Sequence, residues 1–290
     1  MNASKIHCSH WLIIGLCLFS FSAQAEAQGR KKNPTSKLYV ADVNGFAQID
    51  TGETIDPLTK RSVYSAQGTV IETKIDSNNS LVLSNGTGMY FAEDTRLEIR
   101  KFAQEPFTPN RRDMEVEPSI SNTQAFLPRG TIALCTSKMV AGSSMRYSTP
   151  QGHMRIDARR AVIETDSEGT TISLLDGNIT MQNGRLDAGG QTIESGQQMF
   201  VPASGGPAVI RPIPQAHMAA LDDMVAIACM ARKQVYFDVV QNDNNQQQAG
   251  ATAFDKADDS PDEIVAVETT PKDPDVSLTV SAARLPSRGQ

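Results

Sequence analysis

The chain of 290 residues has few of the residue types on which most metal and catalytic sites depend. It contains four histidines, four cysteines and one tryptophan, and aromatic residues make up 6% of the sequence. A zinc site needs three or four well-spaced His, Cys or carboxylate ligands. No such cluster appears along the sequence, so we expect no metal and no cofactor.

Clustered positive charge is also scarce. The formal net charge is −6, and no basic run is longer than Arg30-Lys31-Lys32. Proteins that bind nucleic acid usually concentrate Lys and Arg in patches or stripes, so nucleic acid is not an expected partner. Much of the negative charge lies in residues 241–290, which hold nine acids and four bases and therefore contribute −5.

The one marked hydrophobic run lies at the N-terminus. Lys5 precedes the apolar run Trp11–Phe21, and Ala23-Gln24-Ala25 follows with small residues at both positions that a signal peptidase reads. This order is typical of a secretory signal peptide. We predict that residues 1–25 are removed, with cleavage after Ala27 as an alternative, and that the mature chain is periplasmic or secreted.

Two other interpretations of this segment are weaker. Eleven residues span about 16 Å as a helix, roughly half of a bilayer's hydrocarbon core, which disfavours a membrane anchor. A lipid-modified Cys17 is disfavoured because Leu16, just before it, is large. No other segment is apolar and long enough to span a bilayer, so we expect no membrane span in the mature chain.

Export also bears on the cysteines. Cys8 and Cys17 would leave with the signal peptide, whereas Cys135 and Cys229 would remain. In an oxidising compartment these two could form a disulfide. Two buried free thiols, which pack as small apolar residues, are the alternative. The sequence leaves both possibilities open.

From residue 38 to residue 201, short runs of alternating apolar and polar residues dominate. In LVLSNGTGMYF (81–91) two such runs flank a turn at Asn85-Gly86, and Asp176-Gly177 is a second dipeptide that suits a tight hairpin. No helical pattern interrupts the runs. The pattern predicts an all-β domain over 38–204, built of stacked short antiparallel strands and resembling a twisted solenoid or a sandwich.

One stretch inside this domain departs from the pattern. Residues 103–129 contain four prolines, at 106, 109, 118 and 128. Proline cannot donate a ladder hydrogen bond and is confined to edges and bulges of sheets. We therefore expect an irregular, Pro-rich loop insertion with at most one edge strand.

After residue 204 the composition changes. Residues 205–240 begin with a Gly/Pro linker, and residues 215–237 predict an amphipathic helix with Met218, Leu221, Val225, Ala228 and Cys229 on one face. The helix would dock on the β-domain or on a partner. The acidic segment 241–290 is poor in apolar residues and predicts a disordered tail, and residues 26–37 predict a polar leader.

The order of the β-runs resembles that of the FecR domain family. The resemblance lies in GTVIET (68–73), in SLVLSNGTGMYFAEDTRLEI (80–99) with its turn Asn85-Gly86-Thr87, and in a later hairpin at Asp176-Gly177. It covers residues 40–201. It implies an extracytoplasmic all-β domain that acts through protein contacts and has no catalytic activity.

The chain also departs from that family's signalling members. Those members place a cytoplasmic helical segment and a membrane helix before the domain, whereas here a signal peptide is expected. They tend to follow the domain with a short α/β module, whereas here a helix and an acidic tail are expected. Control of a sigma factor across a membrane by this chain alone is therefore not expected.

A few residues could be assigned to chemistry, but a simpler role suits each better. Glu164 with Asp166, or Glu93 with Asp94, could form a glycosidase pair, although acids on polar strand faces are usually solvated. DSNNS (76–80) matches only a fragment of a calcium loop. The histidines of the mature chain are His153 and His217, and His153 reads as a surface strand residue.

Sugar-binding β-modules usually stack sugars on exposed aromatic rings. The candidates here are Tyr39, Tyr64, Tyr90 and Tyr147, whose strand context favours buried positions. The leading hypothesis is an exported, non-enzymatic FecR-like domain that contacts an unidentified envelope protein in a signalling or scaffold role. The helix 215–237 and the loop 103–129 would supply the contact. The alternatives are a polysaccharide- or peptidoglycan-binding module and an enzyme whose acids or histidines converge in a pocket.

Overall fold

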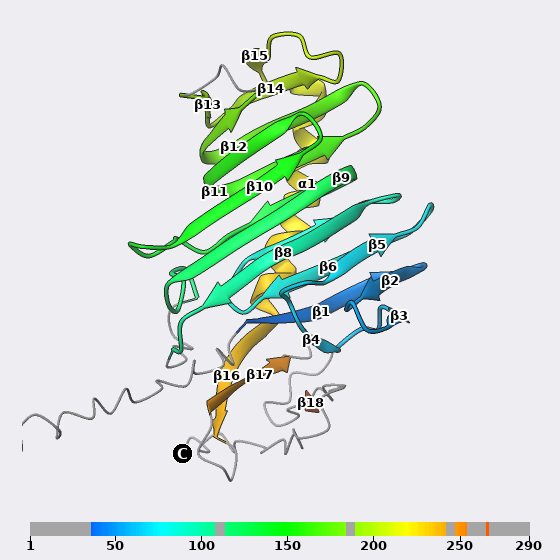
Figure 1. Cartoon of the computed structure of the whole chain (residues 1–290), viewed down its shortest axis with the longest axis vertical. Coiled ribbons are helices and arrows are strands. Elements are labelled where there is room, and N and C mark those ends of the chain that lie inside the picture. Colours follow the sequence, from blue (N-terminus) through cyan, green and yellow to red (C-terminus); the bar gives the residue numbers. More distant parts are fainter. Residues whose placement is uncertain (1–35, 108–113, 184–188, 242–246, 254–264, 267–290) are drawn as a thin grey trace, which may run out of the picture. The chain divides into compact units, whose positions relative to one another are not determined.

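The structure is a computed structural model that describes residues 36–107, 114–183, 189–241, 247–253 and 265–266. The predicted signal peptide and almost all of the predicted leader lie outside the described residues. The described part contains eighteen strands and one helix, α1 (Gln215–Lys233) (Figure 1). The prediction of an all-β fold followed by one amphipathic helix is confirmed.

Strand pairing arranges the large sheet in two layers that share their longest strands. Layer A runs β15-β14-β12-β11-β9-β7-β6-β1-β4, and layer B runs β13-β12-β11-β10-β9-β8-β5-β2-β3. The strands of the first half are β1 (Lys37–Asn44), β2 (Ala47–Asp50), β3 (Ile55–Pro57), β4 (Val63–Ser65), β5 (Val70–Thr73), β6 (Asn78–Leu83), β7 (Gly88–Phe91) and β8 (Arg96–Gln104). Those of the second half are β9 (Ser121–Cys135), β10 (Ser144–Thr149), β11 (Gly152–Thr165), β12 (Gly169–Gln182), β13 (Gln191–Glu194), β14 (Gln197–Pro202) and β15 (Val209–Pro212).

Three long strands pass from one layer to the other. The first half of β9 pairs with β8 and, in parallel, with β10, whereas its second half pairs with β7 and β11. β11 and β12 pair along almost their whole length, with register shifts between Ala158 and Ala161. The sequence pattern predicts stacked short antiparallel strands. The structure instead has three strands of 14 or 15 residues, and one pair, β9 and β10, is parallel.

The dipeptide Asp176-Gly177 is the clearest correction to the predicted turns. It lies inside β12 and does not form a hairpin. Gly177 has φ +109°, and a Cβ there would lie 2.5 Å from Cα of Ala158. Only glycine fits this crowded left-handed position, so the dipeptide bends a strand between the layers.

The Pro-rich segment is shorter than predicted. β8 extends to Gln104 and β9 begins at Ser121, so the connection between strands covers 105–120 and not 103–129. Pro128 lies within β9, where the register against β8 shifts between Phe126 and Arg129. A proline is tolerated there because a bulged residue has no ladder hydrogen bond to donate.

The main apolar core lies between the two layers. Layer B contributes residues such as Ile49, Ile71 and Leu97, and layer A contributes residues such as Leu81 and Ile132, all with at most 1% of their surface exposed. Burial of such side chains is the main favourable contribution to folding. The alternating pattern in the sequence thus marks the inner faces correctly.

The helix α1 covers part of the outer face of layer A (Figure 1). Leu221 and Val225 pack on Ala133 and Val162 of the sheet. Further along α1, Ala231 packs with Tyr39, Ala41, Val63 and Val82. These contacts give the helix an internal partner for its apolar face.

The helix ends at Lys233, four residues earlier than predicted. Val235–Gln241 forms β16 instead, which pairs with β17 (Gln247–Ala253), and β17 pairs with β18 (Val265–Ala266). The β-branched and aromatic residues at the start of this segment favour a strand. β17 and β18 fall inside the segment predicted to be disordered, and most of its remaining residues lie outside the described part.

Among the described residues, no helix has both the length and the apolar character that crossing a bilayer requires.

Candidate functional site

The candidate acids of the sequence analysis occupy separate surface positions. Glu93 accepts a hydrogen bond from the backbone of Asp76 at 2.9 Å. Asp166 accepts hydrogen bonds from the backbone N–H groups of Glu168 and Gly169, at 2.8 and 3.0 Å, and so orders its own turn. Within the described residues, no group of three or more His, Cys, Asp or Glu side chains could hold a metal ion.

One shallow groove brings a candidate acid and a candidate histidine to the same place. It has a volume of about 270 Å³, lies between the start of α1 and the outer face of layer A, and includes Glu164 and His217. Both side chains are exposed. The buried Gln198 in its wall donates a hydrogen bond to Ser173 at 2.9 Å. One acid and one histidine at an open surface do not make an oriented set of catalytic groups. His153, the other candidate, is exposed on β11.

The tyrosines that could have stacked on sugars lie largely inside the fold. Tyr39 and Tyr147 are each 2% exposed, and Tyr64 and Tyr90 are half-buried. The hydroxyl of Tyr147 donates a hydrogen bond to the sulfur of Met89 at 3.7 Å. Tyr39 and Tyr147 therefore offer no ring face to a sugar.

The turn Asn85-Gly86-Thr87 joins β6 to β7 and also supports the neighbouring segment. The backbone N–H of Thr87 donates to the side-chain oxygen of Asn85 at 3.1 Å, and Gly86 has φ +84°. The amide nitrogen of Asn85 donates to the hydroxyl of Ser121 at 3.0 Å, and that hydroxyl donates to Glu117. The turn thereby links β6 and β7 to the 105–120 connection.

Glu117 is a structural residue that the sequence analysis missed. It is 3% exposed and accepts hydrogen bonds from the hydroxyls of Ser121 and Ser143 and from the backbone N–H of Val140. A buried carboxylate is stable only when its oxygens are well satisfied. Its location could not be predicted because residues 121 and 143 meet only in the folded sheet.

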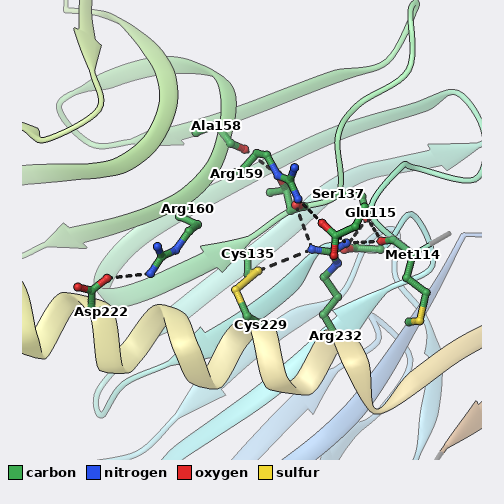
Figure 2. The surroundings of a disulfide bond; sticks show 12 residues. Met114, Glu115, Cys135, Ser137, Ala158, Arg159, Arg160, Asp222, Cys229 and Arg232 are labelled. Atoms are coloured by element: carbon green, nitrogen blue, oxygen red, sulfur yellow. Dashed lines mark hydrogen bonds and ion pairs between the residues drawn. A yellow bond between two sulfur atoms is a disulfide. The ribbon is translucent and has the colours of Figure 1, made fainter.

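Cys135 of β9 and Cys229 of α1 form a disulfide that joins the helix to layer A (Figure 2). Cys135 is 4% exposed, and Cys229 is half-buried. The bond closes a sequence separation of 94 residues. It fixes the C-terminal part of α1 to β9 of the sheet.

A buried arginine lies beside this disulfide. Arg232, one turn after Cys229, is 5% exposed, and its guanidinium donates to the carbonyl of Thr136 at 3.3 Å and contacts the sulfur of Cys135 at 3.8 Å. It also donates to the carbonyl of Met114 (Figure 2). Burial lowers the pKa of Arg232, and the nearby Glu115 partly opposes that shift. An ion pair of 2.7 Å between Arg160 of β11 and Asp222 adds a further polar contact between α1 and the sheet.

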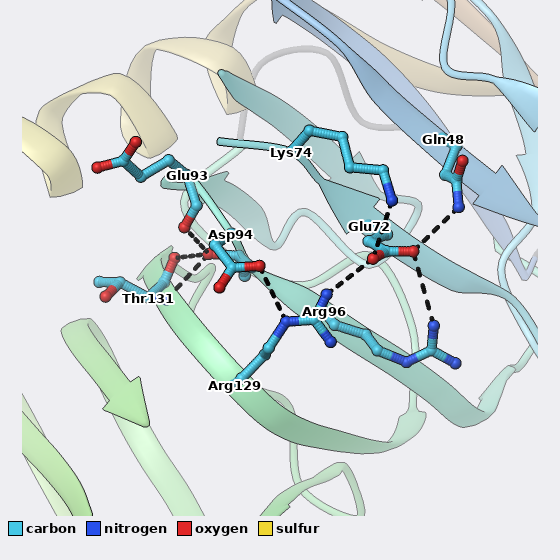
Figure 3. A network of polar contacts seen from close by, with 9 residues as sticks. Gln48, Glu72, Lys74, Glu93, Asp94, Arg96, Arg129 and Thr131 are labelled. Carbon is cyan, nitrogen blue, oxygen red and sulfur yellow. Dashed lines mark hydrogen bonds and ion pairs between the residues drawn. The ribbon is translucent and has the colours of Figure 1, made fainter. Parts of the chain in front are cut away.

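The outer face of layer B has a different, strongly polar character. Glu72 of β5 is at the centre of a polar cluster on this face, where it accepts hydrogen bonds from Gln48 at 2.9 Å and from Arg129 at 2.7 Å (Figure 3). Lys74 and Arg96 approach the same carboxylate at 3.1 and 3.8 Å. Burial raises the pKa of Glu72, but the hydrogen bonds and charges of Lys74 and Arg129 outweigh it, so the net pKa is lowered. The cluster is a paired network that stabilises its own strands.

Further along the same face the charges are less well paired. A cross-strand row runs from Lys101 of β8 through Gln124 of β9 to Arg146 of β10 and Arg155 of β11. We refer to Lys101, Arg146 and Arg155 as the basic row. All three side chains are exposed. Three steps between neighbouring strands place its ends about 14 Å apart.

Two arginines of the basic row lie directly opposite each other. Arg146 pairs with Arg155 in the antiparallel register of β10 and β11, and like charges at such positions are destabilising. Arg155 has an ion pair with Asp157 at 2.9 Å. Among the described residues, neither Arg146 nor Lys101 has an acidic side chain as an ion-pair partner. Beside the row, Arg100 stacks on the ring of Phe126 at 4.2 Å and pairs with Glu98 at 3.3 Å.

Comparisons with known proteins add little to this geometry. No protein-family model and no curated protein matches the chain. Two crystal structures of a "putative anti-sigma factor" from Parabacteroides distasonis, at 2.50 and 1.65 Å resolution, align with it at 11% and 10% identity and TM-scores of 0.39 and 0.38. Each alignment covers 52% of this chain. The alignments cover 62% and 63% of the two anti-sigma factor chains, respectively. The resemblance to the FecR domain family therefore stays a prediction.

Proposed function

We propose that this chain is an exported, non-enzymatic, FecR-like β-domain that works by protein–protein contact at the cell envelope, and that the basic row is its contact surface. The observation that supports this proposal is the exposed pair of Arg146 and Arg155 in direct cross-strand register. We expect the repulsion between these two arginines to cost stability in the isolated chain, because Asp157 pairs with Arg155 alone. An acidic partner would relieve that cost.

The chemistry of the row fits a partner with carboxylates. Arginine binds carboxylates through two parallel N–H···O bonds, and arginines are common among the residues that dominate protein interfaces. The residues of the row belong to strands of a packed sheet, so the backbone holds the three side chains in a fixed arrangement. Phe126, half-buried beneath Arg100, adds an apolar element next to the charges.

The surrounding charges favour an acidic protein segment over a polyphosphate. Glu98 and Asp157 lie among the cations and pair with Arg100 and Arg155. A chain of phosphates would place negative charge against these two carboxylates, whereas an acidic protein segment can place neutral residues opposite them. The net charge of −6 also opposes general attraction to nucleic acid.

The helix α1 is a weaker contact candidate than the sequence analysis expected. Its apolar face packs on layer A, and the disulfide and the ion pair of Arg160 hold it there. The connection 105–120 is tied down in part by Glu117. We therefore assign the contact to the outer face of layer B.

The experiment compares two variants with equal charge changes. Arg146→Glu with Arg155→Glu alters the row, and Lys138→Glu with Lys233→Glu alters exposed lysines elsewhere. The probe is a labelled 16-residue peptide of alternating Glu and Ser, followed by fluorescence anisotropy at increasing salt. We expect the row variant to lose about tenfold or more in affinity, as hot-spot charges do, and the control to lose little. Equal affinities for the two variants would contradict the assignment.

A second arm uses the native envelope fraction. The wild-type chain and both variants are cross-linked to that fraction and recovered. A stoichiometric protein retained by the wild type and the lysine control, and lost from the row variant, supports the proposal. Recovery of glycan without protein, equal for all three chains, would favour the wall-binding alternative.

A further inference from the structure

The two cysteines of the disulfide, Cys135 and Cys229, lie in different environments. The Cys135 side is buried and contacts the guanidinium of Arg232, whereas the Cys229 side is half-buried on α1 (Figure 2). Thiol–disulfide exchange depends on which sulfur can be reached and on how well the other sulfur leaves as a thiolate. The two cysteines therefore differ in exposure, and their sulfurs differ in the positive charge that lies next to them.

We propose that this disulfide is a directional thiol-exchange site, in which an external thiol attacks Cys229 and Arg232 stabilises Cys135 as the leaving thiolate. This inference is independent of the proposed contact surface. In the first step the external thiolate forms a bond to Sγ of Cys229 as the Sγ–Sγ bond breaks. The electron pair of that bond stays on Sγ of Cys135. The product is a mixed disulfide on α1 and a thiolate beside a cation.

A second external thiolate completes the reaction. It attacks the external sulfur of the mixed disulfide and releases Cys229 as a thiolate, which takes a proton from water. Two external thiols are oxidised to one disulfide, and the two protein sulfurs are reduced. The covalent link between α1 and layer A is already broken in the first step, and the contacts of Leu221, Val225 and Arg160 with the sheet remain.

The position of Arg232 favours a thiolate at Cys135. Its guanidinium is 3.8 Å from Sγ of Cys135 and is buried among carbonyl acceptors, and its Nε has no hydrogen-bond partner among the described residues. Glu115 lies 3.8 Å from the guanidinium, and Arg159 pairs with Glu115. A cation next to a cysteine stabilises the thiolate form. When Cys135 is released as a thiolate, the buried guanidinium of Arg232 therefore gains a negatively charged partner.

The first test locates the attacked sulfur in the wild-type chain. The folded protein is incubated with glutathione and iodoacetamide, quenched with acid and mapped by mass spectrometry. We expect glutathione on Cys229 and alkylation on Cys135, at a rate faster than global unfolding. Glutathione on Cys135, or a rate equal to that of global unfolding, would overturn the proposal.

The second test separates charge from packing by the sign of the effect. Arg232→Met removes the cation, and Arg160→Met removes a helix-to-sheet ion pair that does not touch the disulfide. Loss of the cation should slow reduction about tenfold because a poorer leaving thiolate departs more slowly. If the role of Arg232 were only structural, its replacement by Met would make the disulfide more accessible. Reduction of Arg232→Met would then be faster than that of the wild type, as we expect for Arg160→Met. Faster reduction in both variants would refute the electrostatic role.

A third measurement does not depend on the folding of Arg232→Met. Cys229→Ser leaves Cys135 as a free thiol beside Arg232, Arg159 and Glu115, and its ionisation can be followed by thiolate absorbance. We expect the pKa of Cys135 to lie below the ordinary value of about 8.5. A pKa at or above that value would contradict the stabilisation of the thiolate by Arg232.

Discussion

Gly88 of β7 lies directly against the backbone of Ala228 in α1. A Cβ at Gly88 would be 2.1 Å from the carbonyl oxygen of Ala228 and 3.0 Å from Cβ of Arg232. The helix can therefore approach the sheet closely at this point, one residue before the disulfide. The helix α1 can occupy its position on layer A only because residue 88 has no side chain.

Gly88→Ala should destabilise the protein by about 1–3 kcal/mol, because the new methyl group overlaps a backbone atom that can move only with the helix. The free energy of urea unfolding measures the effect. Gly189→Ala is the matched control, since a Cβ there meets no atom within 4 Å. A Gly88→Ala variant as stable as Gly189→Ala would show that the helix shifts without cost.

Glu117→Ala should also be strongly destabilising. The change leaves the hydroxyls of Ser121 and Ser143 and the N–H of Val140 without their acceptor in a buried site. An unsatisfied buried polar group costs about 1–3 kcal/mol, so a loss of at least about 2 kcal/mol is expected. Urea unfolding of Glu117→Ala beside Glu53→Ala, an exposed glutamate, provides the comparison. Equal stabilities would mean that solvent replaces the carboxylate.

The alternating pattern predicts the strands better than it predicts their continuity. HMRIDA (153–158) and AVIET (161–165) read as two strands because the alternation changes phase between them. In the structure they are halves of β11, and the phase change is the register shift at which the strand crosses between layers. A bulge and a turn have the same local signature in sequence. Only the pairing partners, which are distant along the chain, distinguish them.

The charged sites were harder to predict for the same reason. The basic row joins residues from β8, β10 and β11, and its register depends on the order of strands in layer B. Arg232 reads as a favourable charge at the end of a helix, yet it is buried against Thr136 and Cys135. The sequence supplies these residues without indicating which of them meet.

Tyr147→Phe should make the protein more resistant to alkali. Burial raises the pKa of the Tyr147 hydroxyl well above its ordinary value of 10. Below pH 10 the hydroxyl is neutral in both the folded and the unfolded chain, so its ionisation does not reduce the stability of the fold. Above pH 10 the unfolded chain ionises while the folded chain does not, so stability falls by about 1.4 kcal/mol per pH unit until the folded pKa is reached.

The phenylalanine variant lacks that loss. Near pH 7 the two proteins should be almost equally stable, because the hydroxyl donates only to the sulfur of Met89, which is a weak acceptor. Unfolding by urea at pH 7 and at pH 11 measures both effects, with Tyr64→Phe, at a half-buried tyrosine, as the control. Equal losses between pH 7 and pH 11 in the wild type and Tyr147→Phe would contradict the assignment.

Glu72→Gln tests the network on the outer face of layer B at the other end of the pH scale. Burial raises the pKa of Glu72, but Lys74 and Arg129 lower it by more, so the folded pKa lies below the ordinary value of 4.5. A depressed carboxyl pKa stabilises the fold above the unfolded pKa, and that stability is lost as the pH falls through the folded pKa. At pH 7 the variant should therefore be less stable, by about 1 kcal/mol for a partly exposed network.

The difference between wild type and Glu72→Gln should be constant from pH 7 to about pH 5.5 and should shrink below pH 4.5, as both states of the wild type become protonated. Urea unfolding at pH 3, 4, 5 and 7 measures it. Glu53→Gln, at an exposed glutamate, should show little difference at any of these values. A gap between Glu72→Gln and wild type that persists unchanged at pH 3 would mean that the carboxylate charge is not the source of the stability, and that the hydrogen bond from Gln48 or the packing of the side chain is.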